Sequence, residues 1–463
     1  MLPDTIWPGT GSERTRRWHL PHDRGSLGLR SLQDCVIQYL SQTRPGSLPR
    51  RDRRILEVTE RGVPGKDCAM YSNFEFYAPT KIVFGKGAEE NAGKMVKAFG
   101  GTRVLIHYGS QSALRSGLIG RVQQSLDAEG LYHVELGGVV PNPHLGKVYE
   151  GIELGRKEGI DFILAVGGGS VIDSSKTIAL GLANPEDDVW DYYIGKKATN
   201  KSLPIGCILT LAAAGSEMSG GAVITNEKNG LKRDYGADCM RARFSLLNPE
   251  LTMTLPAYQT GCGVADILMH TMERFFNLCD NMEMTDRISV TLMRNVMKYA
   301  KILMKEPDNY KARAEIMWAG TLSHNDLTGC GCAGGDWATH NMEHEMGGMF
   351  DVAHGAGLAA IWGSWARYVY KAAPERFVKF ALEVMGVMPG DHDEDTIESG
   401  IQAMERFYHQ IGMPVNMREL GIEPTEEQIA FMAASCEEKA GGANGQVIPL
   451  KKEDMEEIYR MAL

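Results

Sequence analysis

The chain has 463 residues, a length that suggests about three domains, and its 43% hydrophobic and 23% charged residues exclude a polypeptide too polar to form a core. Its formal net charge of −10 argues against nucleic-acid binding, because a general binder needs a basic surface to displace counterions. No stretch without Asp, Glu, Lys or Arg exceeds 15 residues, whereas a spanning helix needs about 20 mostly apolar ones, so we expect no membrane association.

The cysteine pattern indicates a reducing compartment. The nine cysteines are odd in number, they are spread along the chain, and no two form a C-x-x-C pair. A disulfide framework usually shows an even number at regular spacings. No apolar segment of the kind found in secretory signals follows the first residues. We therefore predict free thiols in a cytoplasmic protein.

Residues 1–69 differ in charge from the rest of the chain. They carry 12 Lys and Arg against 8 Asp and Glu, a net of +4, so residues 70–463, with 37 against 51, carry −14. The segment is rich in Arg, Pro, Ser and Gly and has little sustained periodicity. Two interpretations stay open: a basic, disordered extension, or upstream sequence read from a misassigned start with Met70 as the true first residue.

Residues 70–249 alternate short β-rich runs with helical patterns, which indicates a parallel sheet with crossover connections. The expected strands are residues 81–84, 103–107, 132–136, 161–166 and 244–247, with a hairpin from 222, and the expected helices are residues 112–126, 145–158 and 170–182. We predict a Rossmann-like α/β dinucleotide-binding domain that ends at Asn248-Pro249, with its ligands at the carboxyl ends of the strands.

A glycine turn, Gly167-Gly168-Gly169-Ser170, follows the strand at 161–166 and opens a helix. Glycines let the backbone approach a phosphate, and the helix start offers unpaired N–H groups and the positive end of a dipole. Such turns also close many strand–helix units that bind nothing, but the order of strand, glycines and helix favours a phosphate site. Asp173 and Lys176 follow three and six residues after Ser170.

A second turn follows the strand at 103–107. A site for NAD usually carries an acidic residue here, which accepts from the ribose 2′-hydroxyl, and none is present. The turn instead offers Gly109, Ser110 and Ser112, with Arg115 three residues further on, and these groups suit the 2′-phosphate of NADP. The alternative is an ordinary helix start capped by Ser112, with an exposed Arg115. We favour NADP.

Residues 250–463 are helical almost throughout, with Gly and Pro between the helical patterns, which predicts an all-α domain. Candidate metal ligands with helical spacing occur here: Asp266 and His270 four residues apart, His340 and His344 four residues apart, and then His354. Taken singly, such histidines are more often core or surface residues. A carboxylate and three imidazoles together can bind a divalent transition metal, which can act as a Lewis acid on a carbonyl.

The same cluster permits a different function. The residues from His340 to His344 also spell H-x-x-E-H, the pattern of a zinc hydrolase in which both histidines bind the metal and Glu343 activates water. That interpretation leaves the glycine turn and the α/β half without a role, so an oxidoreductase is the better explanation.

Residues 72–463 resemble the iron-containing (group III) alcohol dehydrogenases, and within them the NADPH-dependent butanol dehydrogenase branch. The motifs that carry the resemblance are GGGSVID at 167–173, Gly215-Ser216-Glu217, Asp266-x-x-x-His270, GDWATH at 335–340 with the run to His344, and DVAHGAG at 351–357. The resemblance implies an N-terminal α/β dinucleotide domain, a C-terminal all-helical domain, a site in the cleft between them, and a homodimer.

The resemblance also assigns residues to roles. It implies that the metal, Fe²⁺ or Zn²⁺, is held by Asp266, His270, His340 and His354. It places His344 beside the substrate and the nicotinamide without ligating. It assigns the pyrophosphate to Gly167, Gly168, Gly169 and Ser170, and the rest of the cofactor site to Asp173, Lys176 and Thr210.

The sequence therefore predicts a metal-dependent, NADPH-linked enzyme that interconverts short- to medium-chain aldehydes, such as butyraldehyde, and their alcohols. Two alternatives stay open besides the hydrolase. One is a polyol or lactaldehyde dehydrogenase of the same fold that uses NAD. The other is a nucleotide-binding protein without catalytic activity, which the presence of all four candidate ligands disfavours.

Overall fold

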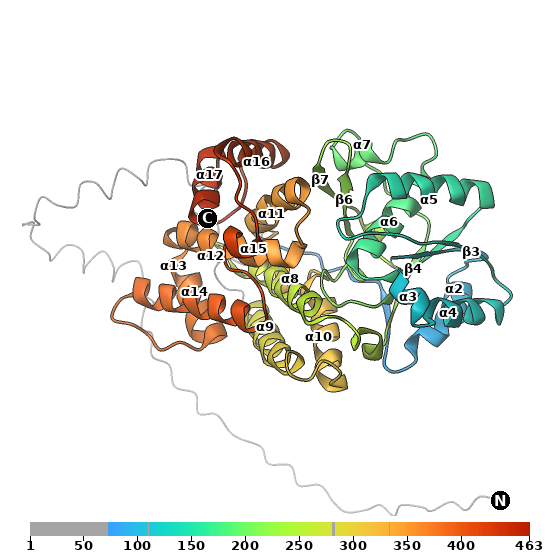
Figure 1. Ribbon diagram of the computed structural model, residues 1–463, viewed down its shortest axis with the longest axis horizontal. Coiled ribbons are helices and arrows are strands. Elements are labelled where there is room, and N and C mark those ends of the chain that lie inside the picture. Colours follow the sequence, from blue (N-terminus) through green and yellow to red (C-terminus); the bar gives the residue numbers. More distant parts are fainter. Residues whose placement is uncertain (1–72, 110, 280–282, 333) are drawn as a thin grey trace, which may run out of the picture. The chain divides into compact units, whose positions relative to one another are not determined.

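The computed structural model describes residues 73–463 except 110, 280–282 and 333, so the predicted basic extension at 1–69 lies outside the described residues. The described chain forms an α/β half followed by a helical half, which confirms the predicted fold class (Figure 1). Along these residues, no helix combines the length and apolar character that crossing a membrane requires. Free thiols in this part of the chain include Cys207, Cys239, Cys262, Cys330, Cys332 and Cys436.

The α/β half is built on a six-stranded parallel sheet with the order β1-β8-β5-β4-β2-β3. Its strands are β1 (Lys81–Phe84), β2 (Arg103–Tyr108), β3 (Tyr132–Leu136), β4 (Phe162–Gly167), β5 (Ile205–Leu209) and β8 (Phe244–Leu247). The chain passes from β2 to β3 on one side of β2 and then returns to β4 on the other. Parallel sheets bind ligands at such a reversal, beside the carboxyl ends of the strands.

Alternate residues of the central strands point to opposite faces of the sheet, because the side-chain period of a strand is two. Leu105, Ile163 and Ala165 pack against α5 (Leu145–Glu158) and α6 (Gly169–Ala183). Val104, Phe162 and Leu164 pack against η1 (Ala88–Asn91), α2 (Ala92–Ala98) and α4 (Leu118–Asp127) on the other face. Both faces are therefore covered by helices, as Figure 1 shows.

The helix predicted at residues 112–126 is two helices. A short α3 (Gln111–Arg115) ends before Gly117, and α4 begins at Leu118. Gly117 precedes α4 with φ of 72°, in the left-handed region that glycine adopts without strain, so the chain turns there instead of continuing the helix.

A two-stranded antiparallel hairpin stands apart from the main sheet. It consists of β6 (Gly221–Asn226) and β7 (Leu231–Gly236), as the alternation and the turn residues at 226–230 predict. Short helical segments flank it: α7 (Trp190–Tyr193) before, and η2 (Asp238–Met240) and η3 (Pro249–Thr252) after. The hairpin carries side chains of the α/β half to the helical half, as described below.

The helical half is packed around its own apolar core, in which Trp362, Trp365 and Tyr408 are fully buried. Its longer helices are α8 (Ala257–Phe275), α9 (Glu283–Leu303), α10 (Tyr310–Ser323), α11 (Ala338–Phe350), α12 (His354–Val369), α14 (Asp393–Gln410), α16 (Glu426–Lys439) and α17 (Lys452–Met461). Shorter segments are η4 (Leu327–Gly329), η5 (Tyr370–Ala372), α13 (Pro374–Lys379), η6 (Phe380–Met385) and α15 (Met417–Leu420). Almost every residue of α8 from Thr260 onward is buried, which makes it the central helix.

Candidate metal centre

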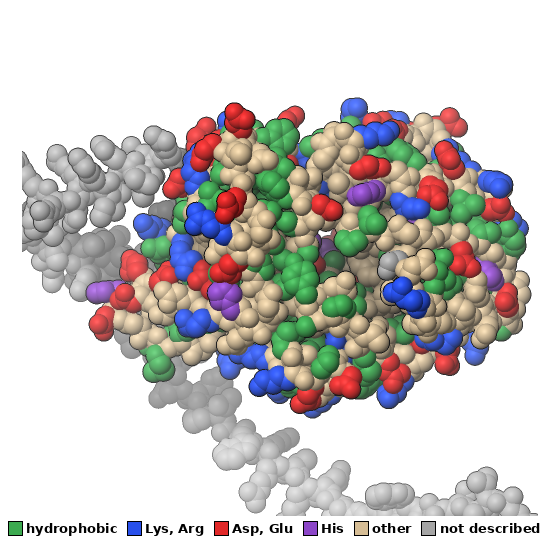
Figure 2. Space-filling model, viewed as in Figure 1, with side chains coloured by type: hydrophobic (Ala, Val, Ile, Leu, Met, Phe, Trp, Pro, Cys, Tyr) green, Lys and Arg blue, Asp and Glu red, His purple; other side chains and the backbone are tan. Residues whose placement is uncertain are grey.

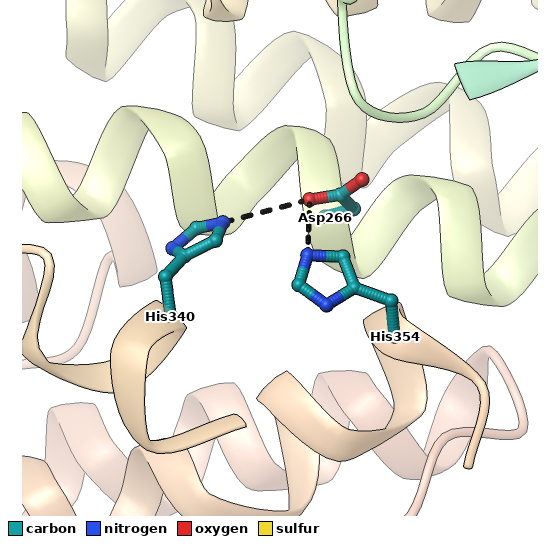
Figure 3. A group of neighbouring side chains, drawn as sticks. All are labelled: Asp266, His340 and His354. Atoms are coloured by element: carbon teal, nitrogen blue, oxygen red, sulfur yellow. Dashed lines mark ion pairs between the residues drawn. The ribbon is translucent and has the colours of Figure 1, made fainter. Parts of the chain in front are cut away.

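Four side chains from three helices converge beside α8. Asp266 and His270 lie one turn apart on α8, His340 lies in the first turn of α11, and His354 is the first residue of α12. Asp266 Oδ1 lies 3.3 Å from His270 Nδ1, 3.7 Å from His340 Nε2 and 3.7 Å from His354 Nε2. Figure 3 shows the carboxylate of Asp266 facing the rings of His340 and His354.

These atoms fit a divalent metal. Asp266 Oδ1, His270 Nδ1 and His340 Nε2 are buried and have no hydrogen-bond partner among the described residues. Buried polar atoms rarely stay unpaired, so three in one place indicate a missing electrophile. Ligand atoms about 2.1 Å from a tetrahedral metal lie about 3.4 Å from one another, close to the separations observed here. Asp266, His340 and His354 each place a ligand atom within 4.8 Å of the other two, and the fourth predicted ligand, His270, meets this group through Asp266 Oδ1.

Two buried carboxylates hold the outer nitrogens of the histidine rings. His340 Nδ1 lies 3.1 Å from Glu273 Oε1, and His354 Nδ1 contacts Glu343 Oε2. A carboxylate can only accept, so each Nδ1 donates, and Nε2 is the nitrogen that faces Asp266 and can bind a metal. Metal-binding histidines are commonly oriented in this way. The sequence interpretation missed Glu273, although its spacing of seven from Asp266 places both on one face of α8.

Without a bound metal, the carboxylates beside His340 favour the protonated form of its ring. Burial opposes the charged ring, but the neighbouring carboxylates of Asp266 and Glu273 raise the pKa of His340 to about 9. A metal ion that bound this ring at neutral pH would displace a proton.

The geometry does not support a hydrolase with Glu343 as its base. The Glu343 side chain is fully buried, and Oε2 contacts both His354 Nδ1 and Lys232 Nζ, the latter at 3.1 Å. Burial favours the neutral carboxyl, but attraction to His354 and Lys232 lowers the pKa of Glu343 to about 2. The carboxylate is thus occupied by two cationic or donor groups and has no access to a water molecule that it could activate.

The metal cluster and the first glycine turn are joined by residues 211–215, which follow β5. A Cβ on Gly169 would lie 3.1 Å from Ala214 Cβ, and a Cβ on Gly263, one turn before Asp266, would lie 2.3 Å from the carbonyl oxygen of Ala212. The space-filling view is hollowed between the α/β and helical halves, with a histidine side chain visible in the hollow (Figure 2).

Two family models together match nearly all of the described chain. The model for iron-containing alcohol dehydrogenases matches residues 79–249, and the model for the C-terminal part of the same family matches residues 260–463. The chain belongs to the iron-containing alcohol dehydrogenase family. It is a metal-dependent alcohol dehydrogenase or aldehyde reductase.

Similar proteins carry the names of both cofactors. The chain is 39% identical to the probable NADH-dependent butanol dehydrogenase 2 of Bacillus subtilis, over 84% of this chain and 100% of that one. It is 34% identical to the NADPH-dependent aldehyde reductase YqhD of Escherichia coli, over 76% and 90%. The crystal structure of an NADH-dependent butanol dehydrogenase A from Thermotoga maritima has a TM-score of 0.81 at 37% identity, covering 85% and 99%.

Both predicted cofactor turns of the enzyme lie at the reversal of strand order. Tyr108 at the end of β2 is paired with Val166 of β4, so Gly109 and the turn at Gly167 are neighbours at the carboxyl edge of the sheet. A Cβ on Gly109 would lie 3.4 Å from Val171 Cγ2 in α6. Gly168, Gly169 and Ser170 are half-buried at the start of α6, whose first N–H groups have no partner within the helix.

Asp173 and Lys176 are engaged by the enzyme's own chain. Asp173 accepts hydrogen bonds from Ser216 Oγ at 2.6 Å and from the Val223 N–H at 2.9 Å, and burial raises its pKa. Lys176 is fully buried and donates to Ser216 Oγ at 3.0 Å and to the Gly221 carbonyl at 2.6 Å. Both residues thus fix residues 216–223 against α6. Thr210, half-buried, donates its N–H to the Gly167 carbonyl at 3.0 Å.

The second turn presents exposed groups. Ser112 and Arg115 lie on α3, where both are exposed, and Ser110 lies outside the described residues. Sequence interpretation missed a further cation here. The Gly138 N–H donates to the Gly109 carbonyl at 2.8 Å, and a Cβ on Gly138 would lie 3.6 Å from Lys147 Nζ.

His344 is buried beside the cluster, and one of its ring nitrogens lies within 4.8 Å of ligand atoms of Glu343 and His354. Its Nδ1 lies 3.0 Å from Lys439 Nζ, and its ring centroid lies 5.7 Å from that of His354. Lysine can only donate, so Nδ1 accepts and Nε2 carries the proton. Burial, together with the charges of Lys439 and Lys232, lowers the pKa of His344 well below its usual value.

Proposed function

We propose that this enzyme reduces short- to medium-chain aldehydes, such as butyraldehyde, with NADPH, and catalyses the reverse oxidation of the alcohols. The observation that carries the proposal is the convergence of unpaired ligand atoms at Asp266, His270 and His340 on helices that pack against the glycine-turn half. The first glycine turn would hold the cofactor, whose nicotinamide supplies the hydride when bound.

Asp266, His270, His340 and His354 would hold the metal ion. When bound, Fe²⁺ or Zn²⁺ supplies Lewis-acid polarisation of the carbonyl group, and the choice between them depends largely on availability. Glu273 and Glu343 hold two of the imidazole rings with Nε2 unprotonated and facing Asp266.

His344 would supply the proton. Its Nε2–H would donate to the substrate oxygen as the carbonyl group is reduced. Nδ1 takes a replacement proton from Lys439, which lies 3.0 Å away. The C–H and O–H bonds formed in this way balance the hydride lost from the nicotinamide and the proton lost from Lys439.

The turn after β2 supports NADPH. Arg115 supplies positive charge near the turn, Lys147 lies close by but is paired with Glu150, and no acidic side chain stands in residues 109–115 to receive a ribose 2′-hydroxyl. The first glycine turn and the start of α6 would hold the pyrophosphate through backbone N–H groups. The NADH-dependent names of several relatives favour NADH as the second candidate cofactor.

The test is a panel of aldehydes from two to eight carbons, assayed with NADPH and with NADH on protein loaded separately with Fe²⁺ and with Zn²⁺. The proposal expects the highest kcat/KM with NADPH and an aldehyde of about four carbons. A higher kcat/KM with NADH would replace the cofactor assignment. Preference for lactaldehyde or a polyol would replace the substrate assignment.

We also propose that the enzyme is a cytoplasmic homodimer. Size-exclusion chromatography with light scattering tests the oligomeric state.

A further inference from the structure

Lys232 comes from the α/β half but reaches the metal cluster of the helical half. It lies on β7, opposite Thr225 of β6, and the hairpin is fixed to α6 by the hydrogen bond from the Val223 N–H to Asp173. Lys232 Nζ lies 3.1 Å from Glu343 Oε2 and 3.4 Å from His354 Nδ1. The side chains of Lys232 and Glu343 are 4% and 0% exposed.

Two glycines leave room for this buried ion pair. A Cβ on Gly347 would lie 2.9 Å from Lys232 Nζ and 3.0 Å from Glu343 Oε1. A Cβ on Gly357 would lie 2.9 Å from Glu343 Cγ. Larger residues at these positions would displace the pair, so the helices α11 and α12 are shaped around it.

The pair controls the orientation of His354. His354 is the first residue of α12 and its ring is half-buried, whereas the ring of His340 is buried. Glu343 accepts the Nδ1–H of His354, and the charge of Lys232 stabilises Glu343 as the carboxylate that can only accept. Nε2 of His354 is then fixed as the free lone pair facing Asp266, 3.7 Å from Oδ1.

We infer that Lys232 and Glu343 are positioning residues for the metal ligand His354, so that the hairpin of the nucleotide-binding half contributes to metal retention in the helical half. The inference rests on the proposed metal site. It predicts that breaking the pair weakens metal binding in a variant that stays folded.

The chain offers a matched control. Arg233 follows Lys232 on β7, and Glu345 lies two positions after Glu343 on α11. Arg233 Nη1 lies 2.9 Å from Glu345 Oε1, so the two residues form a second buried ion pair. Arg233 also donates to Ser435 Oγ at 2.9 Å, away from the metal ligands. Glu345→Gln therefore disturbs the same hairpin–helix contact without touching His354.

The experiment measures the affinity of full-length protein for Zn²⁺ and Co²⁺ by competition with a chromophoric chelator, and records the visible absorption of the Co²⁺ form. Glu343→Gln is expected to bind about 10- to 100-fold more weakly and Lys232→Met about tenfold more weakly, both with altered Co²⁺ bands. Glu345→Gln is expected to keep the wild-type affinity and spectrum. Circular dichroism checks that each variant is folded, and if Glu343→Gln is not, Lys232→Met decides.

Wild-type affinity and spectrum in Glu343→Gln, or in Lys232→Met where that variant decides, would overturn the inference, and so would an equal loss in Glu345→Gln. If wild-type protein bound neither ion, the proposed function would fail, and the inference with it. Wild-type binding with unaffected variants overturns the inference alone.

Discussion

The histidines of α11 have different charge environments although they lie one turn apart. His340 lies beside two carboxylates, Asp266 and Glu273. His344 Nδ1 instead lies 3.0 Å from the ammonium group of Lys439, which is also paired with Asp234. The first environment suits a ring that binds a cation, and the second keeps a ring neutral with its proton on Nε2. At the scale of single residues, the roles proposed for these two histidines, metal ligand and proton donor, differ by environment rather than by residue type.

Replacing His344 with Gln tests the proton donor. Gln has a similar reach but does not relay a proton, so we expect kcat to fall by at least about 100-fold while metal content stays at the wild-type level. Steady-state rates from pH 5 to 9 and metal analysis of the same preparation provide the measurement. An unchanged rate and pH profile would show that His344 has no such role.

At the scale of elements, the reversal of strand order brings two loops together. The turn after β2 and the turn after β4 are neighbours because Tyr108 pairs with Val166. The break at Gly117 makes α3 a separate short helix with no buried residue, so Arg115 is exposed near the carboxyl edge of the sheet. A continuous helix from 112 to 126 would fix Arg115 to the same rigid body as α4.

Arg115→Ala tests the NADPH assignment. One charge-assisted contact to a 2′-phosphate at an exposed site contributes about 1.4 kcal/mol, so KM for NADPH should rise about tenfold. KM for NADH, which lacks that phosphate, should change by less than about twofold. Lys157→Ala, which removes an exposed charge in the last turn of α5, serves as the control. Equal changes for both cofactors would contradict a contact between Arg115 and the 2′-phosphate.

At the scale of the whole molecule, a buried histidine makes the fold sensitive to acid. His107 is fully buried in β2, with Nδ1 2.8 Å from the Leu136 carbonyl of β3 and Nε2 2.9 Å from Ser174 Oγ of α6. Burial, in the main, lowers its pKa to about 4. The unfolded chain takes up a proton near pH 6.5 but the folded chain does not, so this contribution to stability is complete above pH 6.5 and is lost as the pH falls towards 4.

The loss attributable to His107 should be about 3 kcal/mol over this range. His107→Asn keeps a donor for the Leu136 carbonyl but does not titrate, so its free energy of unfolding should fall less between pH 7 and pH 4.5 than that of wild type. Urea unfolding at the two pH values provides the comparison. Equal losses in both proteins would assign the acid sensitivity to other groups.

The fold was largely predictable from sequence, and the site only in part. Alternating strands and helices, and the change to helical patterns after Pro249, are local signals, and they predict the observed α/β and helical halves. The pairs at helical spacing also bring the candidate ligands within reach of one another. The contacts of Glu273 with His340 and of Lys232 with His354 join residues 67 and 122 positions apart. Local periodicity carries no information about such pairs, and the H-x-x-E-H pattern alone suggested a different role for Glu343.

The central claim is that aldehyde reduction depends on a metal held by Asp266, His270, His340 and His354. Its most direct test is the rate of NADPH oxidation with butyraldehyde in protein stripped by a chelator, then reloaded with Fe²⁺ or Zn²⁺, beside His340→Ala treated in the same way. The account predicts that the stripped protein is inactive, that a single ion per chain restores the rate, and that His340→Ala neither retains metal nor recovers. Full activity in metal-free protein, or in a metal-replete His340→Ala variant, would contradict it.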